Sequence, residues 1–191
     1  MERELTASMR TTGIGKGLTK YYLSQPNTTV IAGLRNTTNA DATALNQLPV
    51  ADGSILILAR IDSTSPLDAK TAISNLKSEH EISHIDIAIA NAGICDHLLP
   101  LAEMDIAELS RHIDTNTYGV LRLFQATWPI LQKARAPKFV CISSSLGSIS
   151  QCGGEAPYTG AYGISKAAAN FLVSKIDAEY ENLNAFSIDH G

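Results

Sequence analysis

The 191-residue sequence predicts an α/β protein built on a parallel sheet with helices on both faces. Short apolar runs of strand length alternate along the chain with longer segments that have helical spacing. The runs are nearly free of polar residues, which is typical of strands buried on both sides. We therefore expect a doubly wound sheet with three layers in the order helix, sheet, helix.

Five apolar runs are the expected strands. They are residues 28–34 (TTVIAGL), 54–59 (SILILA), 85–90 (IDIAIA), 138–143 (KFVCIS) and 185–188 (AFSI). A poorer candidate, Leu5 to Ser8, precedes them, and it is short and half polar.

Helical patterns fill the intervals between these runs. The candidate helices cover residues 15–24, 67–79, 106–133 and 158–180. The chain has no repeat, low-complexity tract or linker, so residues 1–191 are expected to form a single domain. Ligands of such sheets bind beyond the carboxyl ends of the strands, and the site is expected there.

The composition, with 45% hydrophobic and 18% charged residues, is that of an ordinary globular protein. A net charge of −4 without a Lys/Arg cluster argues against nucleic acid or a membrane surface as partner. No apolar run has the ~20 residues of a membrane span, and the first residues lack the apolar core of a signal peptide. Three cysteines without C-x-x-C spacing indicate reduced thiols. The expected location is the cytoplasm.

The stretch HEISH, His80 to His84, matches the zinc-protease pattern H-E-x-x-H. That pattern needs a helix, because only there do two histidines four residues apart share a face. Here an apolar strand begins at Ile85, so the helix is expected to end at or before His84. The pair is interpreted as a solvated helix end, and no metal site is predicted.

Two glycine-containing segments follow expected strands or open expected helices. TTGIGKGL, with Gly13 and Gly15, begins the first helix, where backbone N–H groups and the helix dipole can hold a pyrophosphate. Glycine pairs of this kind are equally common in plain turns. ANAG, residues 90–93, closes the strand that follows HEISH.

The carboxyl half carries a more specific pattern. Tyr162 and Lys166 are four residues apart in an expected helix, so an ammonium would lie beside a phenol. A nearby cation favours the phenolate and would turn the tyrosine into a usable acid or base. The hydroxyls of ISSSLGS, residues 142–148, end a strand where they could bind a carbonyl oxygen, and Asn116 is a polar residue in an otherwise apolar helix.

Together these residues resemble the short-chain dehydrogenase/reductase family, whose Rossmann-fold enzymes move hydride between a nicotinamide cofactor and a carbonyl or alcohol. Tyr162 and Lys166 match the Y-x-x-x-K pair of the family. Ser144, three residues before Gly147, matches its S-x-x-G serine, with Ser143 and Ser145 as the alternatives. The segments GIGKGL, TVIAGLRN and FSID look most similar to ketoreductases of the norsolorinic acid type.

The resemblance implies a role for each matching residue. Ser144 and Tyr162 would bind the substrate carbonyl, and Tyr162 would protonate it. Lys166 would lower the pKa of Tyr162 and hold the nicotinamide ribose, and Asn116 would position a water molecule. The cofactor-binding residues would be Gly13, Ile14, Gly15, Arg35, Asp62, Asn91, Ala92, Gly93, Tyr162 and Lys166.

The choice between cofactors depends on the end of the strand at residues 28–34. An acidic residue there holds the ribose of NAD, whereas an arginine accommodates the 2′-phosphate of NADP. The strand is followed by Arg35 and no acid, which favours NADPH over NADH. Asp62 matches the family aspartate near the adenine, and it could equally be a turn or helix-cap residue.

The chain departs from the family pattern at both ends. Met9 stands where the first glycine of T-G-x-x-x-G-x-G is expected, in the register that leaves a normal helix before residue 28. The sequence stops at Gly191, with His190 in the usual proline position, so the family's last helix and strand have no counterpart. These parts normally cover the substrate and support oligomers.

The sequence thus predicts an NADPH-dependent ketoreductase acting on a small-molecule ketone or secondary alcohol, in secondary (polyketide) metabolism. A homo-oligomer is expected to be weakened by the shortened end. The alternative hypothesis is a catalytically silent relative or fragment that acts as a non-enzymatic binding protein. The presence of all four matching residues, Asn116, Ser144, Tyr162 and Lys166, favours the enzyme. The altered glycine loop favours the alternative.

Overall fold

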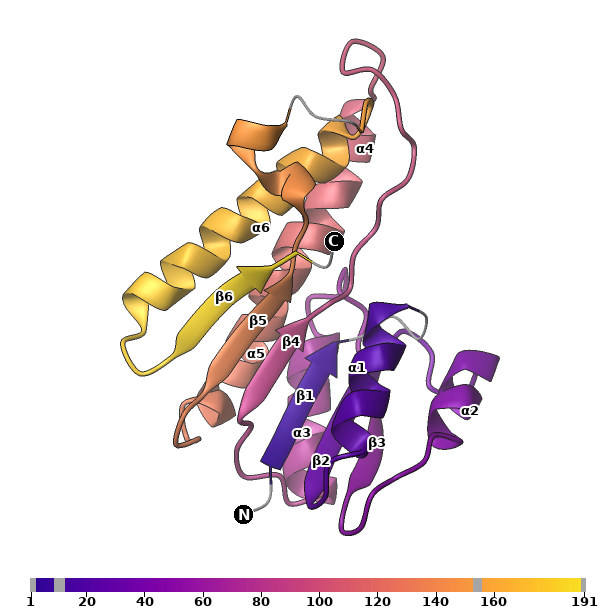
Figure 1. The fold of residues 1–191 in the computed structure, drawn as a ribbon, viewed down its shortest axis with the longest axis vertical. Coiled ribbons are helices and arrows are strands. Elements are labelled where there is room, and N and C mark those ends of the chain that lie inside the picture. The colour runs from indigo at the N-terminus through magenta and orange to yellow at the C-terminus, as the bar shows by residue number, and fades with distance from the viewer. Residues whose placement is uncertain (1–2, 9–12, 153–155, 190–191) are drawn as a thin grey trace.

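The computed structural model describes residues 3–8, 13–152 and 156–189. These residues form a parallel sheet of six strands with helices on both faces (Figure 1). The strands are β1 (Arg3–Ser8), β2 (Thr28–Leu34), β3 (Ile55–Arg60), β4 (Ile87–Ala90), β5 (Lys138–Ile142) and β6 (Asn184–Ile188). Their order is β3-β2-β1-β4-β5-β6, so the direction of winding reverses between β1 and β4. The expected doubly wound α/β fold is confirmed.

Helices cover the two faces of the sheet unequally. They are α1 (Ile14–Leu23), α2 (Ala40–Asn46), α3 (Asp68–Glu79), α4 (Ile106–Ile113), α5 (Gly119–Leu131) and α6 (Gly160–Glu179). The main core lies between the sheet and α3, α5 and α6, where strand residues such as Ile31, Phe139 and Cys141 are buried. α1 and α2 pack on the opposite face in two smaller clusters. Apolar residues alternate between these faces along β2, β3, β4 and β5, which produces the three layers.

The first strand is longer and better placed than its sequence suggests. β1 begins at Arg3, and it lies at the centre of the sheet between β2 and β4. Its residues pair in parallel register with Thr28–Gly33 on one side and Ile87–Ala90 on the other. Backbone hydrogen bonds on both edges therefore compensate for the poor strand propensity of this segment.

Two further elements differ from the expected boundaries. α2 has no counterpart among the expected helices; it begins where the Asn39 side chain accepts a hydrogen bond from the Ala42 N–H (3.0 Å), an N-cap. The long helix expected over 106–133 is divided into α4 and α5 by a single π-helical turn, η1 (Asp114–Tyr118). π turns are rare and often mark functional sites.

The HEISH segment does not adopt the arrangement that a zinc protease needs. α3 ends at Glu79, His80 is its C-cap, and residues 81–85 belong to no helix or strand. His80 and His84 therefore do not share a helix face. His84 instead lies near Asp86, with 3.7 Å between Nε2 and Oδ2.

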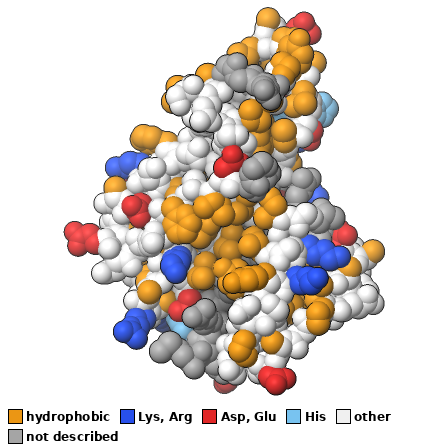
Figure 2. Space-filling model, viewed as in Figure 1, with side chains coloured by type: hydrophobic (Ala, Val, Ile, Leu, Met, Phe, Trp, Pro, Cys, Tyr) orange, Lys and Arg blue, Asp and Glu red, His pale blue; other side chains and the backbone are white. Residues whose placement is uncertain are grey.

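One face of the sheet carries an apolar patch. Figure 2 shows hydrophobic side chains gathered at the centre of this view, over the region that β4, β5, β6 and α1 occupy in Figure 1. Phe186 and Ile188 of β6 are 37% and 40% exposed, and they lie beside Val140 and Ile142 of β5 in the register of the sheet. In the described part of the chain, no helix combines the length and the apolar character that crossing a membrane requires.

Candidate active site

A cavity of about 310 Å³ opens at the carboxyl ends of β4 and β5, between the start of α1 and the first turns of α6. Its lining residues are Gly13, Ile14, Asn91, Gly93, Ile94, Cys95, Ile142, Ser143, Tyr162 and Lys166. Six of the expected site residues are among them. The parallel topology explains this meeting, because loops that follow neighbouring strands emerge at the same edge of the sheet.

A second hollow, of about 500 Å³, lies between β3 and α3. None of the expected site residues lines it. Its Arg60 and Asp68 form an ion pair with each other at 3.7 Å. The smaller cavity is therefore the candidate site, because it brings together the expected Tyr162 and Lys166.

Tyr162 and Lys166 lie one turn apart on α6 and both reach the cavity. Lys166 is 4% exposed, and its Nζ donates a hydrogen bond to the Ile142 carbonyl at the end of β5 (2.6 Å). The same nitrogen is 5.7 Å from the centre of the Tyr162 ring. The buried ammonium is thus fixed beside the phenol by a backbone carbonyl.

Burial shifts the pKa values of these two groups in opposite directions. It raises the pKa of the half-buried Tyr162 above its ordinary value, while a hydrogen bond with the Ser144 side chain acts in the lowering direction. It lowers the pKa of Lys166, because a cation is disfavoured away from water. We expected Lys166 to lower the pKa of Tyr162, but burial is the main influence on this pKa and acts in the opposite direction.

The structure separates Ser144 from its two neighbours. Ser144 Oγ caps the short 3₁₀ turn η2 (Ser145–Gly147) by accepting from the Leu146 N–H (3.2 Å), and it also reaches Tyr162. The buried Ser143 hydroxyl donates instead to Asn170 Oδ1 on α6 (2.6 Å). Ser145 is exposed. Of the three hydroxyls, Ser144 is thus the one that the structure brings to the phenol.

Glycines allow this close approach of η2 to α6. A Cβ on Gly147 would lie 2.8 Å from Lys166 Cβ and 2.9 Å from the Lys166 carbonyl carbon. A Cβ on Gly163 would lie 2.8 Å from the Leu146 carbonyl oxygen. These distances are shorter than carbon atoms tolerate, so the serine turn can rest on the tyrosine helix only where side chains are absent.

Asn116 lies in η1 and is completely buried. Its Oδ1 accepts from the Ile94 N–H (2.8 Å), and its Nδ2 donates to the Ile94 carbonyl and the Ser165 hydroxyl (both 2.9 Å). Ser165 in turn donates to the Tyr162 carbonyl (2.7 Å). Both hydrogens of the Asn116 amide bind protein, so the side chain joins the β4 loop to α6, and its expected role in positioning a water molecule stays a prediction.

The glycine segment is described only from Gly13 onward. Gly13 is the N-cap of α1 with φ +66°, a conformation that glycine adopts without strain, and it lines the cavity with Ile14. Gly15 is buried in the first turn of the helix. The first N–H groups of a helix have no acceptor within the helix, and such groups can bind a phosphate. Met9 lies outside the described residues.

Arg35 and Asp62 follow β2 and β3 at the same edge of the sheet. Asp62 Oδ1 accepts from the N–H and the hydroxyl of Thr64 (2.9 and 2.7 Å), and these bonds, with Arg35 and Arg60 nearby, lower its pKa. Asp62 therefore forms a turn with Thr64, and its expected position near the adenine stays a prediction. Arg35 is exposed. Neither residue lines the cavity around Tyr162, and Asn91 and Gly93 do.

Comparison with known proteins places these features in a family. The model for the short chain dehydrogenases matches residues 10–188. The chain belongs to the short-chain dehydrogenase family. This family consists of NAD(P)-dependent oxidoreductases, so the chain is an oxidoreductase of this kind, and the cavity with Tyr162 is its candidate active site.

Fungal ketoreductases are among the similar proteins. The chain is 41% identical to norsolorinic acid ketoreductase of Emericella nidulans and 43% identical to that of Dothistroma septosporum, in each case over 94% of this chain and 68% of the relative. It is 46% identical over 84% of its length to a short chain dehydrogenase of Penicillium aethiopicum, of which it covers 64%. The chain therefore spans about two thirds of the length of these dehydrogenases.

A solved structure gives the same fold. The NADPH-bound carbonyl reductase from chicken fatty liver superposes with a TM-score of 0.85 at 25% identity, over 99% of this chain and 79% of the reductase. The resemblance deduced from the Tyr162 and Lys166 motifs is thus confirmed at the level of the family.

Proposed function

We propose that the protein reduces a ketone to a secondary alcohol with NADPH. The observation that carries the proposal is the placement of a half-buried Tyr162 between the Ser144 hydroxyl and the buried Lys166 ammonium, in the cavity at the start of α1. Similar proteins named as ketoreductases support the direction of the reaction.

The residues of the cavity fit this chemistry. When bound, the cofactor supplies the hydride. Ser144 and Tyr162 donate hydrogen bonds to the carbonyl oxygen, which gains negative charge as the hydride arrives. Tyr162 then gives its proton to that oxygen, and its raised pKa keeps the proton available at neutral pH. The Lys166 ammonium stabilises the phenolate that remains.

NADPH is proposed over NADH on the evidence of Arg35. Arg35 comes directly after β2, at the position where its guanidinium could bind the 2′-phosphate. The acidic residue that would bind the ribose of NAD is absent from this position. The first turn of α1 supplies N–H groups for the pyrophosphate, and Lys166 a donor for the ribose. The chicken carbonyl reductase that shares the fold is an NADPH-bound protein.

The proposed substrate is an apolar ketone of polyketide type. Side chains of Ile94, Cys95 and Ile142 give the cavity largely apolar walls, and Lys166 is the charged side chain among its lining residues. The named activity of the fungal relatives points to the same class of substrate. We propose the cytoplasm as the location, which agrees with three cysteines that are all free thiols.

The first experiment is a titration of the purified chain with NADPH and NADH, followed by cofactor fluorescence and by melting temperature. We expect micromolar NADPH binding, weaker NADH binding and a raised melting temperature. An Arg35→Gln variant should lose most of the preference for NADPH. A folded protein that binds neither cofactor would contradict the proposal and favour a catalytically silent relative.

The second experiment isolates Tyr162. Tyr162→Phe should bind NADPH as the parent chain does, while ketone turnover falls by about 10²–10⁴-fold, the usual contribution of a general acid. Tyr21→Phe, a change in an exposed ring on α1, is the matched control and should keep full activity. Turnover that survives in Tyr162→Phe would exclude this phenol as the proton donor.

A further inference from the structure

The β4 loop forms one wall of the active-site cavity. Ile94 and Cys95 line the cavity together with Tyr162 and Lys166, and Asp96 follows them. We call Ile94 to Asp96 the wall segment. After it the chain runs through the exposed residues 97–99 with no helix or strand, so the wall segment precedes an unsupported stretch.

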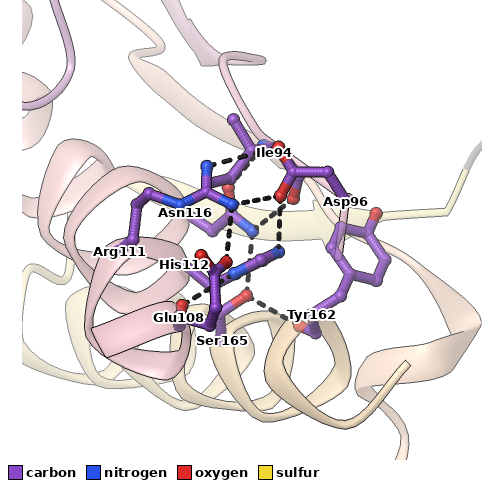
Figure 3. A network of polar contacts seen from close by, with 8 residues as sticks. All are labelled: Ile94, Asp96, Glu108, Arg111, His112, Asn116, Tyr162 and Ser165. Atoms are coloured by element: carbon purple, nitrogen blue, oxygen red, sulfur yellow. Dashed lines mark hydrogen bonds and ion pairs between the residues drawn. The ribbon is translucent and has the colours of Figure 1, made fainter. Parts of the chain in front are cut away.

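The inner end of the wall segment is fixed by Asn116. Both polar backbone groups of Ile94 are bonded to that side chain, which also binds Ser165 on α6. Figure 3 shows these contacts close to a second group of residues, on α4, that surrounds Asp96.

The outer end of the wall segment is fixed by Asp96. Arg111 of α4 donates hydrogen bonds to both oxygens of this carboxylate, and the bond from Nη1 to Oδ2 is 3.2 Å long. Arg111 also donates to Glu108 Oε2 (2.8 Å). A two-point bond of this kind fixes orientation as well as distance. It also holds the pKa of Asp96 below its ordinary range.

His112 adds a contact from below. Its side chain is completely buried, and Nδ1 lies 2.9 Å from the Glu108 carbonyl. A carbonyl only accepts, so Nδ1 carries the hydrogen. Nε2 then points to Asp96 Oδ1 at 3.5 Å without a hydrogen bond. The imidazole therefore lies directly against the carboxylate of Asp96.

The same three side chains have ligand atoms close enough for a cation. Asp96, Glu108 and His112 each place one within 4.8 Å of the others. Arg111 already forms ion pairs with both carboxylates, however, so their oxygens are engaged without a metal ion. The arrangement thus favours a mechanical role over a metal site.

We propose that Asp96, Arg111 and His112 are positioning residues that hold Cys95 in the cavity wall and thereby determine how the ketone fits. The part that concerns the ketone rests on the proposed function. The part that concerns Cys95 does not, because the position of a thiol can be measured without turnover.

Cys95 is an internal probe of the wall segment. Cys95 is exposed, but partial desolvation and the neighbouring Asp96 raise the pKa of its thiol, which lowers its thiolate fraction and its reactivity toward thiol reagents. Cys152 is the other exposed cysteine, and Cys141 is buried. A Cys152→Ser background therefore leaves Cys95 as the thiol that reacts, and Cys95→Ser in that background verifies the signal.

Two variants separate a mechanical effect from an electrostatic one. Asp96→Asn removes a negative charge near the thiol, and Arg111→Gln removes a positive one. If charge alone governed Cys95, the two variants would change its rate of modification by a disulfide reagent in opposite directions. If the contacts hold the segment, both variants should raise the rate, by about fivefold for an exposed two-point ion pair. Arg111→Lys should restore part of the slow rate.

The outcomes decide each part of the proposal. Rates that move in opposite directions, or stay unchanged in either variant, overturn the positioning role. In ketone reduction, both variants should raise KM several-fold while kcat and NADPH affinity change less. Faster thiol modification with unchanged KM would overturn the role in ketone fit. An inactive parent chain would contradict the proposed function and leave the thiol measurement valid.

Discussion

At the scale of single residues, the active site depends on how burial treats two neighbouring ionisable groups. Removal from water favours the neutral form of each, so it raises the pKa of Tyr162 and lowers that of Lys166. The phenol thereby keeps the proton that reduction consumes. The ammonium is kept in place by the Ile142 carbonyl, which partly replaces the water that Lys166 has lost.

Ser144→Ala tests this balance. The serine hydrogen bond acts to lower the pKa of Tyr162, so its loss should raise that pKa further. We expect the absorbance change of phenolate formation, taken as the difference from Tyr162→Phe, to shift to higher pH. Ser145→Ala, at an exposed hydroxyl, should leave the titration unchanged. A shift to lower pH would show that Ser144 binds the neutral phenol preferentially.

The sign of the link to stability follows from the raised pKa. A buried neutral Tyr162 stabilises the fold at every pH below the ordinary tyrosine pKa of about 10. The contribution is lost as the pH rises from there through the higher pKa of the folded protein. In Tyr162→Phe, which cannot ionise, this loss above about pH 10 should be absent from the pH dependence of unfolding by urea.

Gly147 and Gly17 offer a matched pair of substitutions. A methyl group at Gly147 would overlap Lys166, and overpacking of this kind costs about 1–3 kcal/mol of unfolding free energy. At Gly17, in the interior of α1, a methyl group meets nothing within 4 Å, and alanine should stabilise the helix by up to about 1 kcal/mol. Urea unfolding of the two alanine variants measures both effects. Equal stabilities would contradict the close packing of η2 on α6.

At the scale of elements, the π turn η1 has a structural task. It places Asn116 where one side chain binds the β4 loop and α6 together. The next element, α5, stays in place through Arg122, which donates to the Ser63 carbonyl (2.8 Å) and to Asp114 Oδ1 (2.7 Å). The helix is thus tied to the loop after β3 and to η1.

Asn116→Ala should loosen this junction. It leaves two buried backbone groups of Ile94 without partners, which costs about 1–3 kcal/mol for each group that water does not reach. We expect a lower unfolding free energy and faster hydrogen exchange at Ile94. Gln125→Ala, an exposed amide on α5, is the control and should change neither. An unchanged rate of hydrogen exchange at Ile94 would contradict the proposed role of Asn116 in holding the β4 loop.

The elements also show what a sequence can and cannot predict. The strands from β2 to β6 follow apolar runs, and the boundaries differ by at most two residues, because burial on both faces demands that pattern. β1 was undervalued because its stability comes from neighbours on both edges. α2 was missed because seven residues with two buried apolar side chains leave little periodicity.

Site residues that belong to a local sequence motif could be predicted, whereas contacts between residues distant in the sequence could not. The pair Tyr162 and Lys166 and the serine turn could be located because each has a fixed local spacing. The saturation of the Asn116 amide could not, since it depends on Ile94 and Ser165, which are distant in sequence. Cys95 and Asp96 were also missed as parts of the cavity wall; their position directly after the ANAG turn was the available signal.

At the scale of the whole molecule, the apolar patch on β5 and β6 includes the partly exposed side chains of Phe186 and Ile188 (Figure 2). A contiguous patch of this kind promotes association and lowers solubility. The chain covers about two thirds of its fungal relatives, and a homo-oligomer remains a prediction.

The double variant Phe186→Ser, Ile188→Thr should therefore be more soluble than the parent chain. We expect it to precipitate at a higher ammonium sulfate concentration and to elute as a smaller or more uniform species in size-exclusion chromatography. Phe171→Ser removes an exposed ring from α6, and it is the control for the loss of a single aromatic side chain. If Phe171→Ser and the double variant raised the solubility equally, the patch on β6 would not be a particular cause of association.

The central place of β1 also determines how the molecule responds to trimming. Most chains tolerate the loss of a few terminal residues, because such residues are poorly anchored. Here Arg3–Ser8 provides the hydrogen-bonded ladder on both sides, to β2 and to β4. A protease that removed these six residues would divide the sheet into β2–β3 and β4–β6, with no strand between β2 and β4. The candidate active-site cavity thus depends on a short strand that lies far from Tyr162 and Lys166 in the sequence.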